Sequence, residues 1–257
     1  MSAVAPRRRR GRRAALVVVV TLVLLVVAAV VGDWIARRAV ADRAAASLRE
    51  ALALPADRTV DVEVAGWAVL PQLIAGRLDR LDLRSSDVVF GELDGDVAAT
   101  LIGVPVSAVG AIDSGSTMVA IDAASVAQLV TERSTVPVDE VTLDPPLMRV
   151  SASVDVLGVT LGAGIGMQLA AVDGAIQLTP AEISAAGATF SVTDFRDRFG
   201  AVSGDLLAPT PLCIADSVPR GLTLTGVEVA EESLNASFAL SPTFLSDPAE
   251  QEPGTCS

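Results

Sequence analysis

The N-terminal segment of this sequence joins a cluster of positive charge to a long apolar run. Six of the first thirteen residues are arginine, and the run from Ala14 to Val31 is apolar except for Thr21. As a helix rising about 1.5 Å per residue, the run spans roughly 27 Å, close to the roughly 30 Å hydrocarbon core of a bilayer. Because positive charge stays on the cytoplasmic side, the segment predicts one crossing, with the N-terminus inside and the rest of the chain outside.

A cleaved signal peptide is the alternative interpretation, since it has the same basic and apolar regions. Its best small-x-small site, Ala39–Val40–Ala41, lies well beyond the apolar run and behind Arg37 and Arg38. We therefore favour an uncleaved anchor in the inner (plasma) membrane, with the C-terminal domain in the periplasm-like or extracellular space. The chain then divides into a cytoplasmic basic tail at 1–13, a transmembrane anchor at 14–32, an exported domain at 33–245 and an acidic tail at 246–257.

Charge and composition exclude several classes of function. All 31 acidic residues follow position 32, whereas six of the nineteen basic residues precede it, so the exported part is strongly acidic. This argues against nucleic acid as a partner and against simple electrostatic adhesion to anionic lipid head groups. The sequence has no histidine, which removes the usual general base, histidine triads and histidine-ligated zinc. We predict no catalytic residue, no metal and no cofactor, and we expect a protein that is not an enzyme.

The two cysteines, Cys213 and Cys256, both lie in the part predicted to be exported. An oxidising compartment favours a disulfide between them, and the alternative is two unpaired small apolar residues. Cys256 lies in a polar tail, Asp247 to Ser257, that has little else to hold it. We therefore favour the disulfide.

Residue patterns predict helices and strands in a mixed order. Apolar residues at helical spacing predict an amphipathic helix over 34–54, which Pro55 ends, and Asp122 is placed to cap a second helix at 123–131. Apolar and polar residues alternate in the manner of half-buried strands at 60–64, 149–156, 222–229 and 234–240. Asp173–Gly174 predicts a hairpin. Thr179 to Glu182 fits either a short helix that stops at Gly187 or a continued hairpin strand.

Two groups of carboxylates could suggest chemistry, but each has a simpler explanation. Asp87, Glu92, Asp94 and Asp96 have no established calcium-loop spacing, so we expect a solvated turn. The charges from Asp194 to Arg198 predict a surface turn with local ion pairs.

One strand pattern, at 159–169, is unusual, because glycine alternates with larger residues at 162, 164 and 166. Such a strand has one apolar face and one nearly bare face, which indicates strong bending or the close approach of a neighbour. The few aromatic residues and many aliphatic ones fit either an ordinary core or a cavity for acyl chains. The odd positions of the strand are Val159, Leu161, Ala163, Ile165, Met167 and Leu169.

Three stretches resemble the LmeA family of actinobacterial phospholipid-binding envelope proteins. The first is 60–83, where Leu70, Gln72, Leu73, Ile74 and Gly76 fall on the family's turn between two strands, after a Gly-aromatic corner at Gly66–Trp67. The second is the hairpin at Asp173–Gly174, and the third is 218–234, VPRGLTLTGVEVAEESL, which is similar to a strand pair near the family's C-terminus.

The resemblance implies an α+β fold that holds phospholipid. The expected fold is an N-terminal transmembrane helix, then a long amphipathic helix and a strongly curved, mostly antiparallel sheet that wraps it around an apolar tunnel, as in tubular lipid-binding proteins. The implied role is maintenance of cell-envelope lipid or lipoglycan. The candidate lipid-binding residues are Trp67, Leu70, Leu73, Ile74, Val159, Leu161, Ile165, Met167 and Leu169.

The alternative function is a non-enzymatic scaffold that supports an envelope enzyme complex. Its protein partners are not predicted by the sequence. For head-group recognition the candidates are Arg77, Arg80 and Arg84, although solvated arginines at a strand edge explain the same residues.

Overall fold

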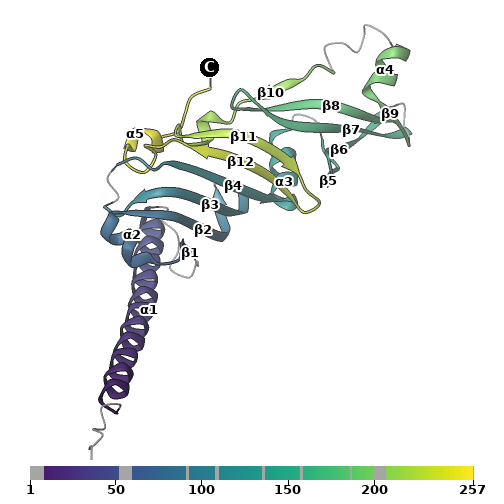
Figure 1. Cartoon of the computed structure of the whole chain (residues 1–257). Coiled ribbons are helices and arrows are strands. Elements are labelled where there is room, and N and C mark those ends of the chain that lie inside the picture. Colours follow the sequence, from purple (N-terminus) through teal and green to yellow (C-terminus); the bar gives the residue numbers. More distant parts are fainter. Residues whose placement is uncertain are drawn as a thin grey trace, which may run out of the picture.

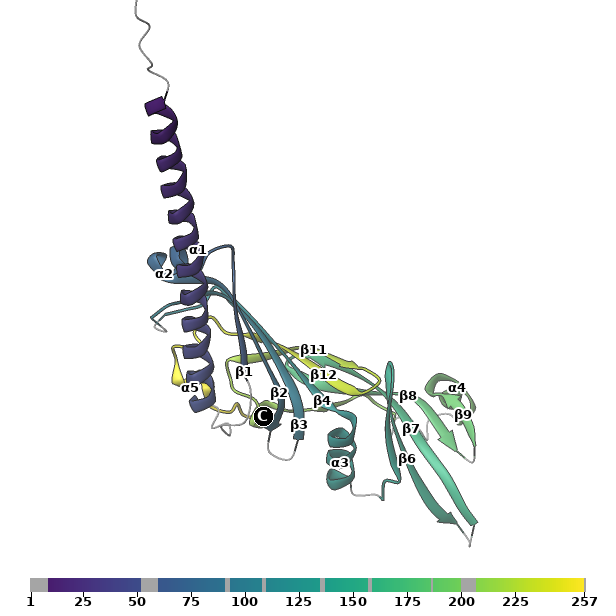
Figure 2. The ribbon, with the colours of Figure 1, turned by 90° about the horizontal axis from the view of Figure 1, so that it is seen from below.

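The computed structural model describes residues 9–51, 60–90, 93–107, 110–134, 137–156, 159–185, 187–199 and 207–256. Its N-terminal element is one uninterrupted helix, α1 (Arg9–Ala51), which unites the predicted anchor with the predicted amphipathic helix. The N-terminal half of α1 projects away from the sheets (Figures 1 and 2). The helix is long and apolar enough to cross a membrane, and none of its most apolar window is buried.

The rest of the described chain forms two antiparallel sheets joined end to end (Figure 1). Sheet A has the order β1-β2-β3-β4-β12-β11, and sheet B has the order β10-β8-β7-β6-β5, with β9 paired to β8. The strands of sheet A are β1 (Val60–Ala65), β2 (Arg77–Phe90), β3 (Leu93–Pro105), β4 (Ser114–Asp122), β11 (Leu222–Val229) and β12 (Ser233–Leu240). Those of sheet B are β5 (Glu140–Asp144), β6 (Leu147–Val156), β7 (Val159–Val172), β8 (Ala175–Ala185), β9 (Ala188–Ser191) and β10 (Thr210–Leu212).

Short helices lie at the turns and ends of this framework. They are α2 (Val69–Ala75), α3 (Ala123–Arg133), α4 (Val192–Phe199), the 3-10 helix η2 (Ala215–Ser217) and α5 (Pro248–Gln251). The Asp122 side chain accepts a hydrogen bond from the Ser125 N–H, which confirms the predicted cap of α3.

The two faces of sheet A differ in polarity because side chains alternate along each strand. In the register of β2 and β3, Leu81 pairs with Leu101 on one face, and Asp82 pairs with Thr100 on the other. The first face, which we call the inner face, carries the buried clusters of the domain. The second, the outer face, carries the Arg80–Asp82 ion pair.

Three apolar clusters cover the inner face in different places. At the β1–β3 end, Val64, Leu81 and Leu101 are buried, and Val40 of α1 packs against them. At the β11–β12 end, Leu224, Ala236 and Phe238 are buried against Ala171 and Ile176 of sheet B. Beside them, Val126 of α3, Met148 of β6 and Val229 of β11 form the third cluster. Sheet A is thus covered by α1 at one end and by sheet B at the other.

The strands predicted at 60–64, 149–156, 159–169, 222–229 and 234–240 are confirmed as β1, β6, β7, β11 and β12, and the hairpin has the expected turn. Asp173 and Gly174 have φ angles of 50° and 77°, as a two-residue hairpin loop that matches the twist of its strands requires. The stretch from Thr179 to Glu182 continues the hairpin within β8 and does not form a helix.

Three predictions about shape and turns are wrong. The sheets are not strongly curled and do not wrap α1, and a tubular lipid-binding fold is not confirmed. The charges from Asp194 to Arg198 lie on helix α4, where a surface turn was expected. The hydroxyl oxygen of Ser191, just before the helix, accepts a hydrogen bond from the Asp194 N–H at 3.0 Å and so stabilises the first turn. Asp94 and Asp96 belong to β3, where a turn was expected; Glu92 lies outside the described residues, and so does the side chain of Asp87. No cluster of potential metal ligands occurs in the described part of the chain.

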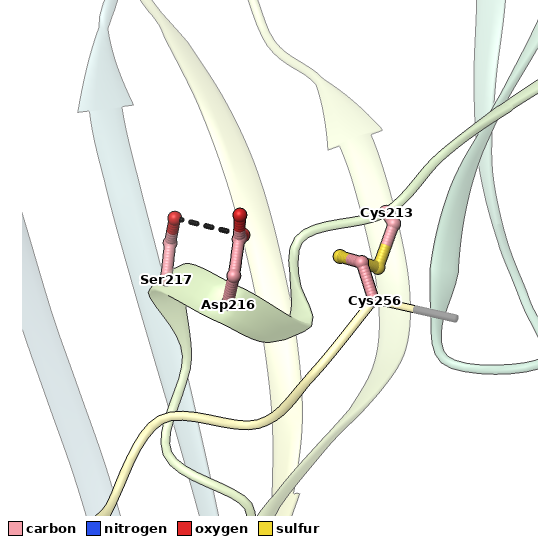
Figure 3. The surroundings of a disulfide bond; sticks show 4 residues. All are labelled: Cys213, Asp216, Ser217 and Cys256. Atoms are coloured by element: carbon pink, nitrogen blue, oxygen red, sulfur yellow. Dashed lines mark hydrogen bonds between the residues drawn. A yellow bond between two sulfur atoms is a disulfide. The ribbon is translucent and has the colours of Figure 1, made fainter.

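The predicted disulfide between Cys213 and Cys256 is confirmed, with Cα atoms 5.9 Å apart (Figure 3). The acidic tail it holds is also tied by backbone hydrogen bonds. The backbone N–H groups of Arg220 and Gly221 donate to the backbone carbonyls of Glu252 and Glu250. The N–H of Gly254 donates to the carbonyl of Val218. The disulfide therefore closes a segment that already lies along the end of sheet A.

Candidate functional site

The inner face of sheet A keeps a partly exposed apolar strip between α1 and sheet B. Five side chains from three neighbouring strands form it, and all are half-buried: Leu83 of β2, Val97 and Ala99 of β3, and Thr117 and Val119 of β4. The strand register places them in two adjacent rows, Leu83–Ala99–Thr117 and Val97–Val119. We call these five residues the inner strip.

Each end of the inner strip continues into a buried cluster. Leu83 packs against the cluster under α1, and Val119 packs against the cluster under sheet B. Met167 and Leu169 of β7 pack in the neighbouring cluster with Ile121, which follows Val119 on the same face of β4. The strip is thus an apolar surface with few polar groups, bounded on two sides. Such a surface suits aliphatic chains, which need apolar contact and few directional partners.

Two recesses in the described part are too small to enclose a two-chain lipid. One has a volume of about 190 Å³ and the other about 310 Å³, at or below the low end of the roughly 300–1,000 Å³ typical of sites for drug-sized ligands. The larger one lies between the start of β11 and the C-terminal tail. Neither is the apolar tunnel that the strand pattern suggested.

The smaller recess lies on the glycine face of β7, and most of the side chains that line it are polar or charged. Arg149 reaches across it to the carboxylates of Glu182 at 2.6 Å and Asp144 at 3.0 Å. The hydrogen bond to Glu182 raises the pKa of the Arg149 guanidinium, so this group stays charged. A Cβ atom at Gly164 would collide with Oγ of Ser184. Gly164 and Gly166 therefore make room for Ser184 and Glu182 of β8.

The nine lipid-binding candidates from the sequence fall into two groups that the structure keeps apart. Trp67, Leu70, Leu73 and Ile74 lie in and beside α2, next to α1, whereas the other five lie on β7 in sheet B. Figures 1 and 2 both place α2 and β7 at opposite ends of the domain. On β7, the side chains of Ile165, Met167 and Leu169 are half-buried. The side chains of Val159 and Leu161 are not among those that the structure describes.

The α2 group is positioned by polar residues whose role the sequence did not reveal. Ala68, at the N-cap of α2, has no capping side chain, and Asp33 of α1 replaces it by accepting the N–H groups of Val69 and Leu70. Buried Gln72 accepts the Asp79 N–H at 2.9 Å and donates to the carbonyl of Ala68 at 3.0 Å. These bonds fix the corner before β2.

Within the α2 group, exposure separates one residue from the others. Leu73 is half-buried and packs against the cluster under α1. Trp67 is 89% exposed, Ile74 is 88% exposed and Leu70 is 37% exposed. These three line neither of the two recesses.

The head-group candidates Arg77 and Arg80 already have partners. Arg77 donates to Asp113 at 2.7 Å and to the Gly103 carbonyl at 2.6 Å. Arg80 forms a two-pronged pair with Asp82 on the outer face. Arg84 is exposed on the same face, opposite the inner strip.

A protein-family model matches most of this chain. A model described as LmeA-like phospholipid-binding matches residues 31–239. The chain belongs to the LmeA-like phospholipid-binding family. The match begins where the apolar run of α1 ends and includes the strands of both sheets except the last residue of β12, so the inner strip lies wholly within the LmeA-like region. No curated protein and no solved structure matches this LmeA-like chain.

The inner strip lies mainly on β3 and β4, two strands that the residue patterns above did not predict. A signal was present, since Asp94, Asp96 and Ala98 alternate with Gly95, Val97 and Ala99. The acidic residues were interpreted as a turn, and this concealed the alternation.

Proposed function

We propose that this protein binds phospholipid by laying the acyl chains along the inner strip, outside the cytoplasm and close to the membrane that α1 crosses. The observation that carries the proposal is a half-exposed apolar surface inside the region that matches a phospholipid-binding family. Water contact with such a surface is unfavourable, by about 25 cal/mol for each Å² of apolar area. Acyl chains would remove that contact without needing polar partners.

Met167 and Leu169 extend the proposed site at its sheet B end. They pack beside Ile121 and Leu234 in the cluster that borders the strip. Of the residues selected from the sequence, these two and Leu73, at the α1 end, lie where a lipid on the strip would reach. The proposed role is non-enzymatic, in the maintenance of cell-envelope lipid or lipoglycan, with phospholipid as the bound partner.

The membrane topology belongs to the same proposal. The N-terminal arginines favour retention of the N-terminus in the cytoplasm, so the domain would lie outside it. A reporter enzyme that works only outside the cytoplasm, fused after Ser257, should be active. This topology would be contradicted if that reporter is inactive and a second reporter, one that works only in the cytoplasm, is active at the same position.

The binding site is tested with full-length protein in nanodiscs that contain a phosphatidylethanolamine with a photoreactive diazirine on its acyl chain. After illumination, mass spectrometry of peptides should find lipid attached to β3 and β4 as well as to α1. Attachment to α1 alone would contradict lipid binding by the domain and would favour the scaffold function.

A matched pair of variants isolates the strip. Ala99 is half-buried on the inner face and Ala98 is exposed on the outer face of the same strand. Ala99→Phe should fill the strip and reduce attachment to β3 and β4 severalfold, whereas Ala98→Phe should leave it unchanged. Equal effects of the two variants would contradict the assignment to the inner face.

A further inference from the structure

Helix α2 presents an uncharged apolar surface outward from the domain. Its sequence, VLPQLIA, contains no acidic or basic residue. Trp67, which precedes it, and Ile74, near its end, are almost fully exposed, and Leu70 is more than a third exposed between them. A group of neighbouring large apolar side chains that are this exposed usually marks a surface that contacts a partner or a membrane.

The position of α2 along α1 identifies what this surface would meet. The apolar run of α1 ends at Val31, and a Cβ atom at the next residue, Gly32, would lie 3.7 Å from Cδ1 of Leu70. Asp33 binds the first N–H groups of α2. If the run of α1 spans the hydrocarbon core, as proposed above, α2 lies at the boundary between that core and the water outside.

Residues of α1 at the same level have the composition of a membrane interface. Trp34 and Ile35 are more than half exposed, and the Arg38 guanidinium lies 4.9 Å from the centre of the Trp34 ring. Tryptophan is enriched at membrane interfaces because its ring is apolar and its N–H is polar. This chain has only two tryptophans and no tyrosine. Trp67 lies at the level of Trp34, because Gly66 and Leu70 on either side of it bond Arg37 and Asp33 of α1.

We propose that α2 is a second membrane contact: Trp67, Leu70 and Ile74 insert into the outer interfacial layer of the bilayer beside the exit of α1. The ligand of this surface is the lipid bilayer itself, and it is recognised by apolar insertion and not by charge. Binding of lipid on the inner strip is a separate event on a different face. The inference rests on the proposed crossing of the membrane by α1.

The contact would fix the orientation of the domain. A single helix crossing a bilayer can tilt, and a domain attached to it would tilt with it. Arg37 of α1 donates to the carbonyls of Val64 and Gly66, at 2.9 Å for Gly66, so α1, β1 and the start of α2 move together. With α2 in the interface, the inner strip would keep one distance and direction relative to the membrane.

The two tryptophans allow a direct test in the full-length protein. Trp34→Phe leaves Trp67 as the sole tryptophan, and the protein is reconstituted into vesicles of phosphatidylcholine brominated on the upper part of its acyl chains. We expect the brominated lipid to quench Trp67 emission about as strongly as it quenches Trp34 in the reciprocal Trp67→Phe variant. Iodide in the water should quench Trp67 little, and added salt should change neither result.

A third tryptophan position supplies the control. Met118, exposed on the outer face of β4, becomes the sole tryptophan in a Met118→Trp variant that also carries Trp34→Phe and Trp67→Phe. It should be quenched by iodide and not by brominated lipid. Ile74→Asp should make Trp67 accessible to iodide, because it places a charge in the interface beside it.

The possible outcomes separate the two proposals. If Trp67 behaves like the tryptophan at position 118, the α2 contact is refuted, even if lipid is still attached to β3 and β4. If alkaline carbonate removes the protein from the vesicles, the crossing by α1 is refuted as well. Quenching of Trp67 by brominated lipid in a variant that binds no lipid on the strip supports the α2 contact alone.

Discussion

The Asp33 carboxylate on α1 accepts the backbone N–H of Leu70 on α2 at 2.9 Å. The two residues are 37 positions apart, and the bond joins the helix that can cross a membrane to the first corner of sheet A. Asp33 also forms an ion pair with Arg37, which itself bonds the chain before α2. The link between α1 and sheet A is therefore built from hydrogen bonds as well as apolar packing.

Replacing Asp33 should loosen α2 while the sheets stay folded. Asp33→Ala removes the cap of a seven-residue helix that has no cap of its own, and loss of a cap costs about 0.5–2 kcal/mol. Hydrogen exchange at the N–H groups of Val69 and Leu70 should become faster. Asp42→Ala, at an exposed position on the same helix, is the control and should change nothing. Unchanged protection in Asp33→Ala would contradict the capping role.

Breaking the disulfide should lower stability and release the acidic tail. The bond closes a loop of 43 residues, which corresponds to about 3 to 4 kcal/mol on the chain-entropy model. Cys256→Ser should lower the free energy of urea unfolding by up to that amount. It should also expose residues after Glu252 to carboxypeptidase, since only a few backbone bonds would still hold them. A tail that stays resistant would indicate that those bonds suffice.

Acid should destabilise the domain in part through Asp82. The Arg80 guanidinium at 2.8 Å and the Thr100 hydroxyl at 2.7 Å donate to this carboxylate, and together they lower its pKa. A lowered pKa in the folded state gives stability that is present above the unfolded-state value of about 3.9 and is lost as pH falls through the folded-state value.

Thr100→Val tests this linkage, because it removes one donor and keeps the shape of the side chain. The pKa of Asp82, followed by carbon NMR of its carboxyl group, should rise toward the ordinary value. The loss of unfolding free energy between about pH 6 and about pH 3 should become smaller in the variant. An unchanged pKa would mean that the Thr100 hydroxyl does not stabilise the charged carboxylate.

The sequence predicted the elements whose signals are local. Asp122 caps α3 within three residues, and Asp173–Gly174 supplies both positive φ angles of its turn, so each could be recognised from neighbouring residues. The inner strip could not be recognised in this way. It depends on the pairing of Ala99 with Leu83 and Thr117, which is fixed only when three strands are in register.

The glycine row of β7 shows why the strand was predicted correctly while the strong curling of its sheet was not. Alternation predicts the strand, but glycine has two uses, bending and close approach, and the sequence does not distinguish them. At Gly164 and Gly166 the neighbours are Ser184 and Glu182 of β8, so the glycines serve close approach. The curled sheet inferred from bending is therefore absent from the described strands.

The position of bound lipid can be tested by comparing the strip with β7. Ile165 pairs with Val150 and Ile183 and borders the polar recess that holds Arg149. Ile165→Trp should overpack this place at a cost of about 1–3 kcal/mol, while the folded protein keeps its lipid. Ala99→Phe should reduce the bound lipid, because its ring occupies the inner strip, where Ala99 is half-buried as Ile165 is on β7.

Two measurements on each variant decide between the surfaces. Lipid per folded molecule comes from mass spectrometry of an organic extract, and stability is measured on lipid-free samples, since bound ligand itself stabilises the folded state. Loss of lipid in Ile165→Trp with full retention in Ala99→Phe would move the site to β7, where the strand pattern first suggested it. Retention in Ile165→Trp with loss in Ala99→Phe would assign the acyl chains to the inner face of sheet A, because the two variants then separate lipid binding from packing.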